Sequence, residues 1–374
     1  MPLTIAVARE TEAGEKRVAL APETAKKYAA LGAQIQLERT AGAESHFLDA
    51  DYEDIGYSDG LKNCYGNAQL ILRVTPPTLV EIEAMPEGAT LIGLMRPYES
   101  RERLAAFNKK RLTVFALELL PRISRAQSMD ALSSQGACSG YQCGLIAAAR
   151  CTKFFPMLTT AAGTIRPARV LVIGAGVAGL QAIATCKRLG AMVEAYDVRA
   201  AAREQIESLG AKFVDTGVSA DGTGGYAREL SEEEKAQQAE KLAKAVAAAD
   251  VVITTAAIPG KKAPIIITEE MVGRMKYGAV IVDMAAETGG NCAMTQPGEH
   301  IIANDVNIHG PLNLPSRMPT HSSELYSRNI YNFISPFIKE GNINFDWEDE
   351  VLTGSVLCRD GETVHASVKQ VLGE

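Results

Sequence analysis

The sequence is poor in positive charge, in paired cysteines and in long apolar runs. Its 38 Lys and Arg against 45 Asp and Glu argue against a nucleic-acid partner, because affinity for a phosphate backbone comes mainly from clustered cations. Seven cysteines, an odd number without C-x-x-C spacing, predict neither disulfides nor a bound metal. Every apolar stretch is interrupted well before the roughly 20 residues that cross a bilayer. With no secretory signal at its start, the chain is expected to work in a reducing compartment without spanning a membrane.

Length and composition favour two folded domains. A chain of 374 residues exceeds what one hydrophobic core usually supports, so two lobes with a cleft between them are expected. Hydrophobic residues at 47% and charged residues at 22% are typical of a soluble α/β protein rather than a disordered one.

Strand and helix patterns alternate through the first third of the chain. Pro22 is expected to open a helix that stops at Gly32, since proline suits a helix start and glycine the position beyond its end. Short apolar runs predict strands, and a charged segment at 99–110 predicts a helix. The expected strands are residues 3–8, 68–74, 90–95 and 112–119. This region therefore reads as a parallel α/β lobe.

A second lobe follows a segment rich in small residues at 131–155, which we interpret as a helix packed between the lobes. Its apolar strands are expected at 170–173, 193–196, 251–254 and 280–283, and an Ala-rich stretch at 236–249 reads as an amphipathic helix. After Pro315 a further helix should lead to a hairpin at Asp360-Gly361 and return to the first lobe.

The predicted fold class is α/β, with two Rossmann-like, doubly wound parallel-sheet domains joined by long helices and a cleft between them. The predicted domains are 1–135 plus 315–374, an N-terminal α/β domain, and 136–314, an NAD-binding Rossmann domain.

A glycine turn follows the first strand of the second lobe. Gly174 permits the tight turn, Gly176 lets the backbone approach a diphosphate, and Gly179 allows helix and strand to pack closely. The helix expected at 180–189 directs its positive end and free N–H groups to the phosphates. A glycine turn in a non-binding α/β unit is the alternative, and the strand, helix and following acidic residue together favour NAD(H).

That acidic residue is Asp197, at the end of the second strand. A carboxylate here accepts hydrogen bonds from the adenosine ribose and repels a 2′-phosphate, which favours NAD over NADP. Arg199 lies two residues further and offers a positive charge to such a phosphate, yet Asp197 occupies the place where the phosphate would bind.

The segment at 121–134 places cations, an amide, a carboxylate and hydroxyls at the end of a first-lobe strand, where loops carry function. We expect it to face the cleft and to fix a carboxamide and a sugar. The alternative is an ordinary helix N-terminus, with Ser128 as the cap and Asp130 favouring the helix dipole.

Four motifs make the chain resemble the NAD(H)-binding component, domain I, of the proton-translocating nicotinamide nucleotide transhydrogenases. They are Pro-Arg-Ile-Ser-Arg-Ala-Gln at 121–127, Gly-Ala-Gly-Val-Ala-Gly-Leu-Gln-Ala-Ile at 174–183, Thr-Thr-Ala-Ala-Ile-Pro-Gly-Lys at 254–261 and Gly-Gly-Asn-Cys at 289–292. The resemblance extends over nearly the whole chain and implies a Re/Si-specific NAD(P)+ transhydrogenase that transfers hydride directly between NADH and NADP+.

The resemblance also implies roles for particular residues. The residues implied to act beside the nicotinamide and its ribose are Arg122, Gln127, Asp130 and Ser133. Gln127 is implied to contact both nucleotides. The further residues implied to bind the cofactor are Ile123, Ser124, Arg125, Val177, Val198, Gly225, Tyr226, Ala256 and Ala257.

A glycine-rich insertion at 215–234 contains Tyr226. Taken alone it reads as a mobile, solvated surface loop, whereas the resemblance implies that it closes over the bound nucleotide.

The implied assembly is a homodimer that works with an NADP(H)-binding subunit and a membrane-spanning subunit. The expected location is the cytoplasmic, inner face of the cell membrane, at the periphery, or the matrix face in a mitochondrion. The chain's end at Glu374 is expected to fit a separately encoded subunit or a shortened one.

Alanine dehydrogenases are the main rival, because they share the two-lobed architecture. By eye, their catalytic histidine falls at Arg96, a substrate lysine at Thr75 and the arginine that grips the substrate at Arg17. Oxidation of an amine needs a positioned base, and none of the five histidines falls near Arg96. They are more simply explained as ordinary surface or core residues. Hydride exchange between nicotinamides moves no substrate proton, so it needs positioning alone. An NAD-binding regulatory module remains a further alternative.

Overall fold

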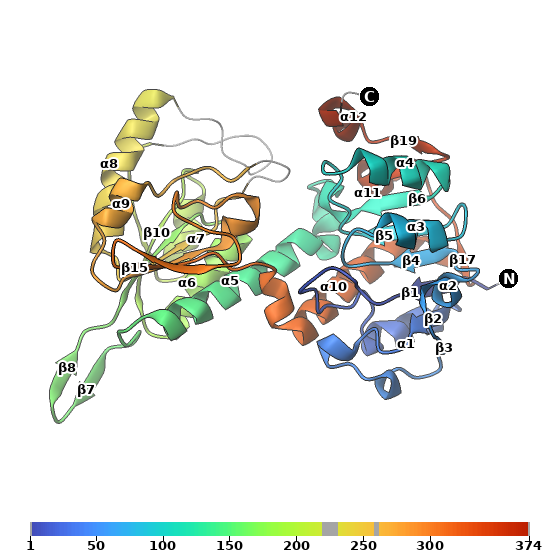
Figure 1. Ribbon diagram of the computed structural model, residues 1–374, viewed down its shortest axis with the longest axis horizontal. Helices are drawn as coiled ribbons and strands as arrows, with labels where there is room; N and C mark the ends of the chain where they lie inside the picture. Colours follow the sequence, from blue (N-terminus) through green and yellow to red (C-terminus); the bar gives the residue numbers. More distant parts are fainter. Residues whose placement is uncertain (1, 219–230, 258–261, 373–374) are drawn as a thin grey trace. The chain divides into compact units, whose positions relative to one another are not determined.

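The computed structural model describes residues 2–218, 231–257 and 262–372. It divides into two compact units. Unit 1 comprises Met1–Gln135 and Pro315–Glu374, and unit 2 comprises Gly136–Leu314. Each unit is built on a parallel-dominated sheet with helices on both faces (Figure 1). The chain is therefore of the α/β class, with two Rossmann-like units.

The sheet of unit 1 is eight-stranded, in the order β19-β18-β6-β5-β4-β1-β2-β3. β1 pairs in parallel with both β2 and β4, so the chain winds outward in both directions from the line between β1 and β4. The strands from the first part of the chain are β1 (Thr4–Val7), β2 (Gln34–Glu38), β3 (Gly56–Ser58), β4 (Leu70–Leu72), β5 (Thr90–Gly93) and β6 (Thr113–Ala116). Such a reversal of strand order opens a crevice at the carboxyl ends of the strands.

Alternate residues of these strands enter two separate hydrophobic clusters. Ile5 faces one cluster with α1 (Pro22–Ala30) and α10 (Pro319–Ile334), whereas its neighbour Ala6 faces the other. The helices on that second face are α2 (Leu61–Tyr65), α3 (Leu79–Ala84), α4 (Arg101–Lys109) and α12 (Ala366–Leu372). Because side chains alternate along a strand, a sheet covered on both faces reads as a continuous apolar run.

The last part of the chain completes this first sheet. β18 (Val356–Arg359) pairs antiparallel with β6 and forms a hairpin with β19 (Glu362–Thr363). Asp360 and Gly361 both have positive φ, as a two-residue turn of this type requires, so the hairpin predicted here is confirmed. The remaining elements of this part are β16 (Ile338–Lys339), β17 (Asn342–Ile343) and α11 (Glu350–Ser355).

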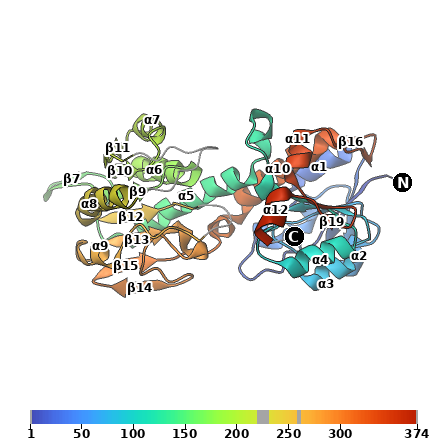
Figure 2. The ribbon, with the colours of Figure 1, turned by 90° about the horizontal axis from the view of Figure 1, so that it is seen from above.

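The sheet of unit 2 is seven-stranded, in the order β11-β10-β9-β12-β13-β15-β14, which Figure 2 shows from above. Its strands are β9 (Arg169–Ile173), β10 (Met192–Tyr196), β11 (Lys212–Phe213), β12 (Val251–Thr254), β13 (Val280–Asp283), β14 (His300–Ala303) and β15 (Val306–His309). β14 runs antiparallel to its neighbour, while the other pairs of these strands are parallel. Here the winding reverses between β9 and β12, the same arrangement as in unit 1.

Helices again cover both faces of this sheet. One cluster unites the sheet with α5 (Ala131–Arg150), α6 (Val177–Arg188) and α7 (Ala202–Ser208). The opposite cluster contains α8 (Glu232–Ala248) and α9 (Glu269–Gly273), and Figure 1 shows both helices on that side. A separate hairpin of β7 (Leu158–Thr160) and β8 (Gly163–Ile165) precedes the sheet.

The small residues of α5 have a different reason from the expected packing between lobes. A Cβ at Gly140 would lie 2.0 Å from the carbonyl oxygen of Ala178, and one at Gly144 would lie 2.9 Å from a side-chain carbon of Thr185. Glycines therefore let α5 approach α6 within unit 2. The helix runs from unit 1 into unit 2 but ends at Arg150 rather than at Phe155. Pro156 disfavours helical conformation at the residue before it.

Other predicted boundaries were also wrong. α6 begins at Val177, directly after the glycine turn, rather than at Leu180. α8 begins at Glu232 because Ser231 and Glu234 form a capping box, a Ser-x-x-Glu signal that the interpretation of 236–249 overlooked. β2 was not predicted, although its Gln-Ile-Gln-Leu-Glu sequence alternates as a strand should.

Candidate functional site

The glycine turn at residues 174–179 joins β9 to α6. Gly174 has a φ of +95°, and a Cβ at Gly179 would lie 1.9 Å from the Gly174 carbonyl oxygen, so both positions require glycine. A Cβ at Gly176 would meet nothing within 4 Å. Gly176 also begins α6 without a side-chain cap. The first N–H groups of α6 are thus left for an anion, and the space over Gly176 fits the diphosphate of a dinucleotide.

The neighbouring strand end locks this turn in place. β12 lies beside β9, and the Thr255 hydroxyl that follows β12 donates to the Gly174 carbonyl at 3.0 Å. The turn and residues 255–257 therefore share the carboxyl edge where the winding of the sheet reverses. Open α/β sheets bind ligands at this place.

Asp197 lies at the same edge and is already engaged. Its carboxylate accepts from the Ala175 N–H at 2.7 Å, from the Arg199 N–H at 2.9 Å and from the Arg199 guanidinium at 2.8 and 2.7 Å. Burial opposes ionisation of Asp197, but these hydrogen bonds and the Arg199 charge outweigh it and lower the pKa of the carboxyl group. The sequence did not reveal that Arg199 neutralises Asp197, and Val198 lies between the two, half-buried.

A buried polar network supports the end of β12, and sequence reasoning found no role for it beyond family likeness. Asn291 is fully buried; its side chain accepts from the Ala256 N–H at 3.0 Å and donates to the Ala256 carbonyl at 2.8 Å. Asp283, at the end of β13, accepts from the N–H groups of Asn291 and Cys292 and from the Thr254 hydroxyl. Polar residues directly after apolar strands were the available signal. This network fixes the backbone of Ala256, while the side chain of Ala257 is exposed.

The segment predicted to act beside the nicotinamide lies in unit 1. Residues Ser124–Met129 form a short 3-10 helix, from which Gln127 projects exposed, and Arg122 is exposed before it. Arg125 pairs with Asp349, whose side chain caps α11. Ser124 is exposed and Ile123 packs partly buried against the core.

The start of α5 differs from the ordinary cap considered above. The carboxylate of Asp130, not Ser128, accepts from the Ser133 N–H at 2.9 Å and also from the Ser133 hydroxyl. Ser128 instead offers its carbonyl to the side chains of Asn329 and Asn332. Asp130 and Ser133 are thus brought together, immediately after Gln127. The predicted Gly225 and Tyr226 lie outside the described residues, as does the 258–261 part of the Thr-Thr-Ala-Ala motif.

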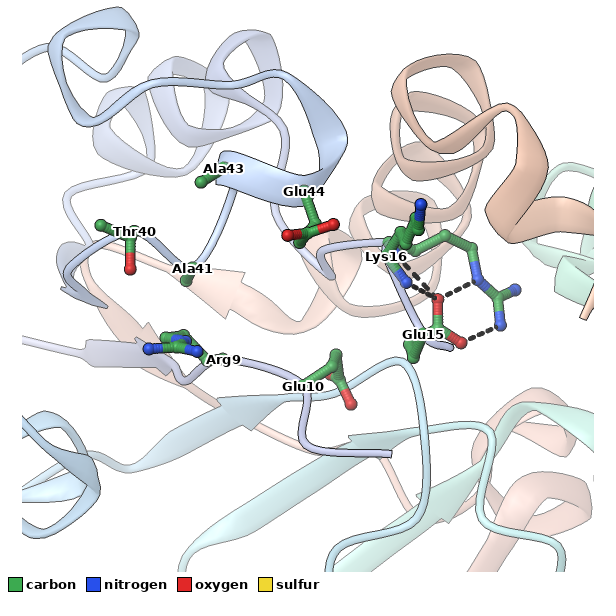
Figure 3. A pocket seen from close by; sticks show the side chains of 9 residues that line it. Arg9, Glu10, Glu15, Lys16, Thr40, Ala41, Ala43 and Glu44 are labelled. Carbon is green, nitrogen blue, oxygen red and sulfur yellow. Dashed lines mark hydrogen bonds and ion pairs between the residues drawn. The ribbon is translucent and has the colours of Figure 1, made fainter. Parts of the chain in front are cut away.

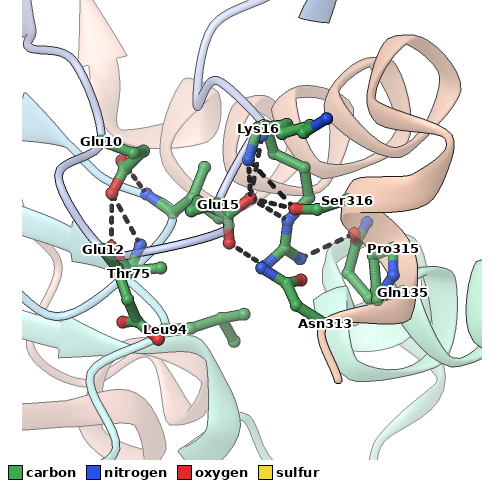
Figure 4. A network of polar contacts seen from close by, with 12 residues as sticks. Glu10, Glu12, Glu15, Lys16, Thr75, Leu94, Gln135, Asn313, Pro315 and Ser316 are labelled. Atoms are coloured by element: carbon green, nitrogen blue, oxygen red, sulfur yellow. Dashed lines mark hydrogen bonds and ion pairs between the residues drawn. The ribbon is translucent and has the colours of Figure 1, made fainter. Parts of the chain in front are cut away.

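Charged residues crowd the carboxyl edge of the first sheet and pair with one another (Figure 4). Arg73, fully buried after β4, contacts Glu10 at 3.1 Å and Glu81 at 2.8 Å. The Glu10 carboxylate also accepts from the Thr75 hydroxyl at 2.5 Å. Burial raises the pKa of Glu10 despite the nearby Arg73, while Arg73 and its hydrogen bonds lower the pKa of Glu81 against the effect of burial.

Arg17 is paired in the same way. Its guanidinium donates to both oxygens of Glu15 at 2.8 and 2.6 Å and to Gln135 Oε1 at 2.9 Å. Burial opposes ionisation of Glu15, but Arg17 and the Ser316 hydroxyl lower the pKa of Glu15 to about 2. Arg96 donates to Glu12 at 2.7 Å. The three positions compared with alanine dehydrogenases, Arg17, Thr75 and Arg96, therefore all bond to carboxylates of this same chain.

A small cavity lies near this edge, beside β1 and β2 (Figure 3). Its charged lining residues are Arg9, Glu10, Glu15, Lys16, Arg17 and Glu44. Both signs of charge are present in equal number, and none of the predicted site residues lines it. Among the described residues, no helix combines the length and apolar character that crossing a membrane requires.

Comparison with known proteins agrees with this geometry. The family patterns "Alanine dehydrogenase/PNT, N-terminal domain" and "Alanine dehydrogenase/PNT, C-terminal domain" match residues 6–139 and 143–366. An NAD(P) transhydrogenase subunit alpha protein of Rhodospirillum rubrum is 42% identical, over 98% of this chain and 99% of that protein. The protein of the same name from Rickettsia prowazekii is 43% identical, over 98% of each chain.

Solved structures give the same result. A transhydrogenase from Sinorhizobium meliloti matches with a TM-score of 0.86 and 39% identity, covering 97% of this chain and 99% of that one. An L-alanine dehydrogenase matches with a TM-score of 0.82 over 99% of each chain, but at 22% identity this likeness concerns the fold alone. The chain therefore belongs to the alanine dehydrogenase/PNT family, and within it to the alpha subunits of the NAD(P) transhydrogenases.

Proposed function

We propose that this chain is the NAD(H)-binding subunit of a proton-translocating nicotinamide nucleotide transhydrogenase. It holds NADH while hydride passes directly to NADP+ bound on a partner subunit, in a Re/Si-specific reaction coupled to proton movement. The observation that carries this proposal is the switch point of unit 2. There an uncapped helix start, a turn that requires glycine and a buried acid meet at one sheet edge in a chain of this family.

The residues of unit 2 bind the adenosine half of the nucleotide in this proposal. N–H groups at Gly176 and Val177 take the diphosphate, Asp197 takes the ribose, and the backbone of residues 256–257 lies alongside. To accept ribose hydroxyls, Asp197 must share hydrogen bonds that Arg199 now makes. Gly225 and Tyr226 close over the nucleotide.

The nicotinamide end is assigned to the segment 122–133 of unit 1. Bound NADH supplies the hydride; the protein supplies position. Gln127 is exposed and offers both a donor and an acceptor to a carboxamide, while Asp130 and Ser133, already bonded to each other, present oxygens for a ribose. Arg122 adds positive charge beside them.

The paired charges of unit 1 favour hydride exchange over amino-acid oxidation. A dehydrogenase needs a base for the amine proton and a cation for the substrate carboxylate. In this chain Arg17 is neutralised by Glu15, and the position compared with a catalytic histidine is Arg96, which pairs with Glu12. Transfer from one nicotinamide C4 to another moves no substrate proton and requires neither group.

The proposed assembly is a homodimer joined by an NADP(H)-binding subunit and a membrane-spanning subunit, at the inner membrane face. The β7–β8 hairpin supports the homodimer, because Phe154, Met157 and Ile165 in and beside it expose apolar side chains to solvent.

One assay tests the proposal. NADH and the acetylpyridine analogue of NADP+ are supplied with and without the purified NADP-binding subunit, and NAD+ reduction by alanine is followed separately. We expect analogue reduction only with the partner present. Alanine-dependent reduction of NAD+ would replace the proposal with an amino-acid dehydrogenase. Saturable NADH binding without either reaction would support a regulatory module instead.

A further inference from the structure

Asn329 connects the C-terminal part of unit 1 to the segment that carries Gln127. It lies on α10, is 8% exposed, and uses both ends of its amide. Its Nδ2 donates to the Ser128 carbonyl at 2.9 Å, and its Oδ1 accepts from the Ser134 hydroxyl at 2.6 Å. One side chain thus bridges the two ends of the stretch that contains Asp130 and Ser133.

The Ser128 carbonyl is a natural point for such an anchor. It follows Gln127 directly and lies near the end of the 3-10 helix Ser124–Met129, where carbonyls have no further helical N–H to accept from. Asn332, one turn along α10, donates to the same carbonyl at 3.1 Å. Two amides from α10 therefore occupy one carbonyl oxygen, whose two lone pairs allow it.

The other side of the segment is held by packing. Ala126 and Met129, on either side of Gln127 and Ser128, are buried in the core that also contains Ile330 and Phe333 of α10. With its apolar side and its carbonyl both fixed by α10, the 3-10 helix has one orientation in which Gln127 points outward. A hydrogen-bonded amide of this kind defines a geometry more sharply than apolar contact does, because it has a direction.

We propose that Asn329 is a positioning residue for hydride transfer: by holding Ser128 and Ser134 it keeps Gln127, Asp130 and Ser133 in the arrangement that receives the nicotinamide. This inference rests on the function proposed above. It places a requirement for the chemistry on a helix distant in sequence that contacts no nucleotide. Small displacements of positioning groups reduce reaction rates far more than binding.

Four variants test the proposal in the assembled complex, with hydride transfer to the acetylpyridine analogue of NADP+ measured at saturating NADH. Asn329→Asp keeps the acceptor for Ser134 but turns a carboxylate oxygen toward the Ser128 carbonyl. Ser134→Ala removes the other contact, and Ser134→Thr restores a hydroxyl. Arg328→Ala is the matched control, because Arg328 is on the same helix and pairs with Glu23 at the surface.

We expect Asn329→Asp to lower the maximal transfer rate at least tenfold while the NADH dissociation constant, measured on the isolated chain by fluorescence, stays within twofold. Ser134→Ala should lower the rate several-fold, Ser134→Thr should recover most of it, and Arg328→Ala should leave it unchanged. Amide hydrogen exchange over residues 124–130 should accelerate in the first two variants only.

The proposal is overturned if Asn329→Asp and Ser134→Ala lower the unfolding temperature but leave the transfer rate of the folded protein unchanged. It is also overturned if rate and NADH affinity fall together. Should Asn329→Asp not fold, the Ser134 pair decides by itself. If wild-type protein shows no partner-dependent transfer, the proposed function fails first, and this inference falls with it.

Discussion

The two sheets of this protein have the same winding but opposite chemistry at their carboxyl edges. In unit 1 the order reverses between β1 and β4, and in unit 2 between β9 and β12. The edge of unit 2 presents a glycine turn and helix N–H groups without a side-chain cap, whereas the edge of unit 1 presents carboxylates and guanidinium groups that already bind each other. Topology therefore supplies a place for a ligand, and the loop residues decide whether the place is open.

The closed edge is held by charges removed from water. The Arg73 guanidinium contacts two carboxylates and is fully buried from solvent. Such clusters hold a structure firmly once formed, because the loss of one partner leaves the others buried and uncompensated. The comparison predicts that changes at the first edge act on folding, and changes at the second act on NADH binding.

Arg73→Met should give the largest effect on stability. With the guanidinium removed, Glu10 and Glu81 remain buried without a counter-ion, and the free energy of unfolding should fall by about 3–5 kcal/mol. Urea denaturation measures it. Lys26→Met is the control, because Lys26 and Glu53 form an exposed pair, and it should change stability by less than about 1 kcal/mol. Equal effects of the two variants would contradict a closed, buried edge.

Acid should weaken unit 1 through Glu15. Its pKa in the folded protein is about 2, below the ordinary value of 4.5, so its stabilising effect is present above pH 4.5 and is lost as pH falls toward 2. The difference corresponds to about 3 kcal/mol. Glu15→Gln should therefore be less stable than wild type at pH 7, with the gap narrowing toward pH 3 in urea titrations. A gap that stays constant with pH would exclude the paired carboxylate as its cause.

Asp197→Asn tests the open edge. It should weaken NADH binding by about 1.5–3 kcal/mol, the scale of hydrogen bonds to a charged group, in a fluorescence titration. Arg199→Gln leaves the carboxylate in place and should change the affinity less. Unchanged affinity in Asp197→Asn would remove the ribose from this residue.

The two glycines of the turn separate binding from folding. Gly176→Ala should leave the unfolding temperature unchanged, since its Cβ meets nothing within 4 Å, and should weaken NADH at least tenfold, or about 1.4 kcal/mol. Gly179→Ala places a Cβ 1.9 Å from a carbonyl oxygen and should also destabilise unit 2 by about 1–3 kcal/mol. If Gly176→Ala binds NADH as wild type does, the diphosphate does not lie over this turn.

Local patterns predicted the fold well where a signal is contained within a few residues. Buried parallel strands such as Val251–Thr254 and Val280–Asp283 appear as short apolar runs, and both were located to the residue. The positive φ of Asp360 and Gly361 follows from the turn they make. Helix boundaries were predicted less well, because caps such as Asp130 at Ser133 compete with neighbouring candidates such as Ser128.

Contacts distant in sequence were beyond such patterns. Nothing near Asn329 in the chain indicates that its amide reaches Ser128 and Ser134, and nothing near Arg73 names Glu10 as its partner. Side chains with two or more possible partners are assigned only when packing brings one of them within reach.

The sequence alone determined the strand and helix periodicity, the glycine turn with its acid, and the motifs of the family, since each depends on steric and hydrogen-bonding preferences of adjacent residues. The tertiary structure alone decided which charges cancel. Asp197 with Arg199, Arg17 with Glu15 and Arg73 with its two carboxylates are fixed by distances that only the folded chain sets. The physical reason is that an ion pair depends on separation in space and on burial, and separation along the chain specifies neither.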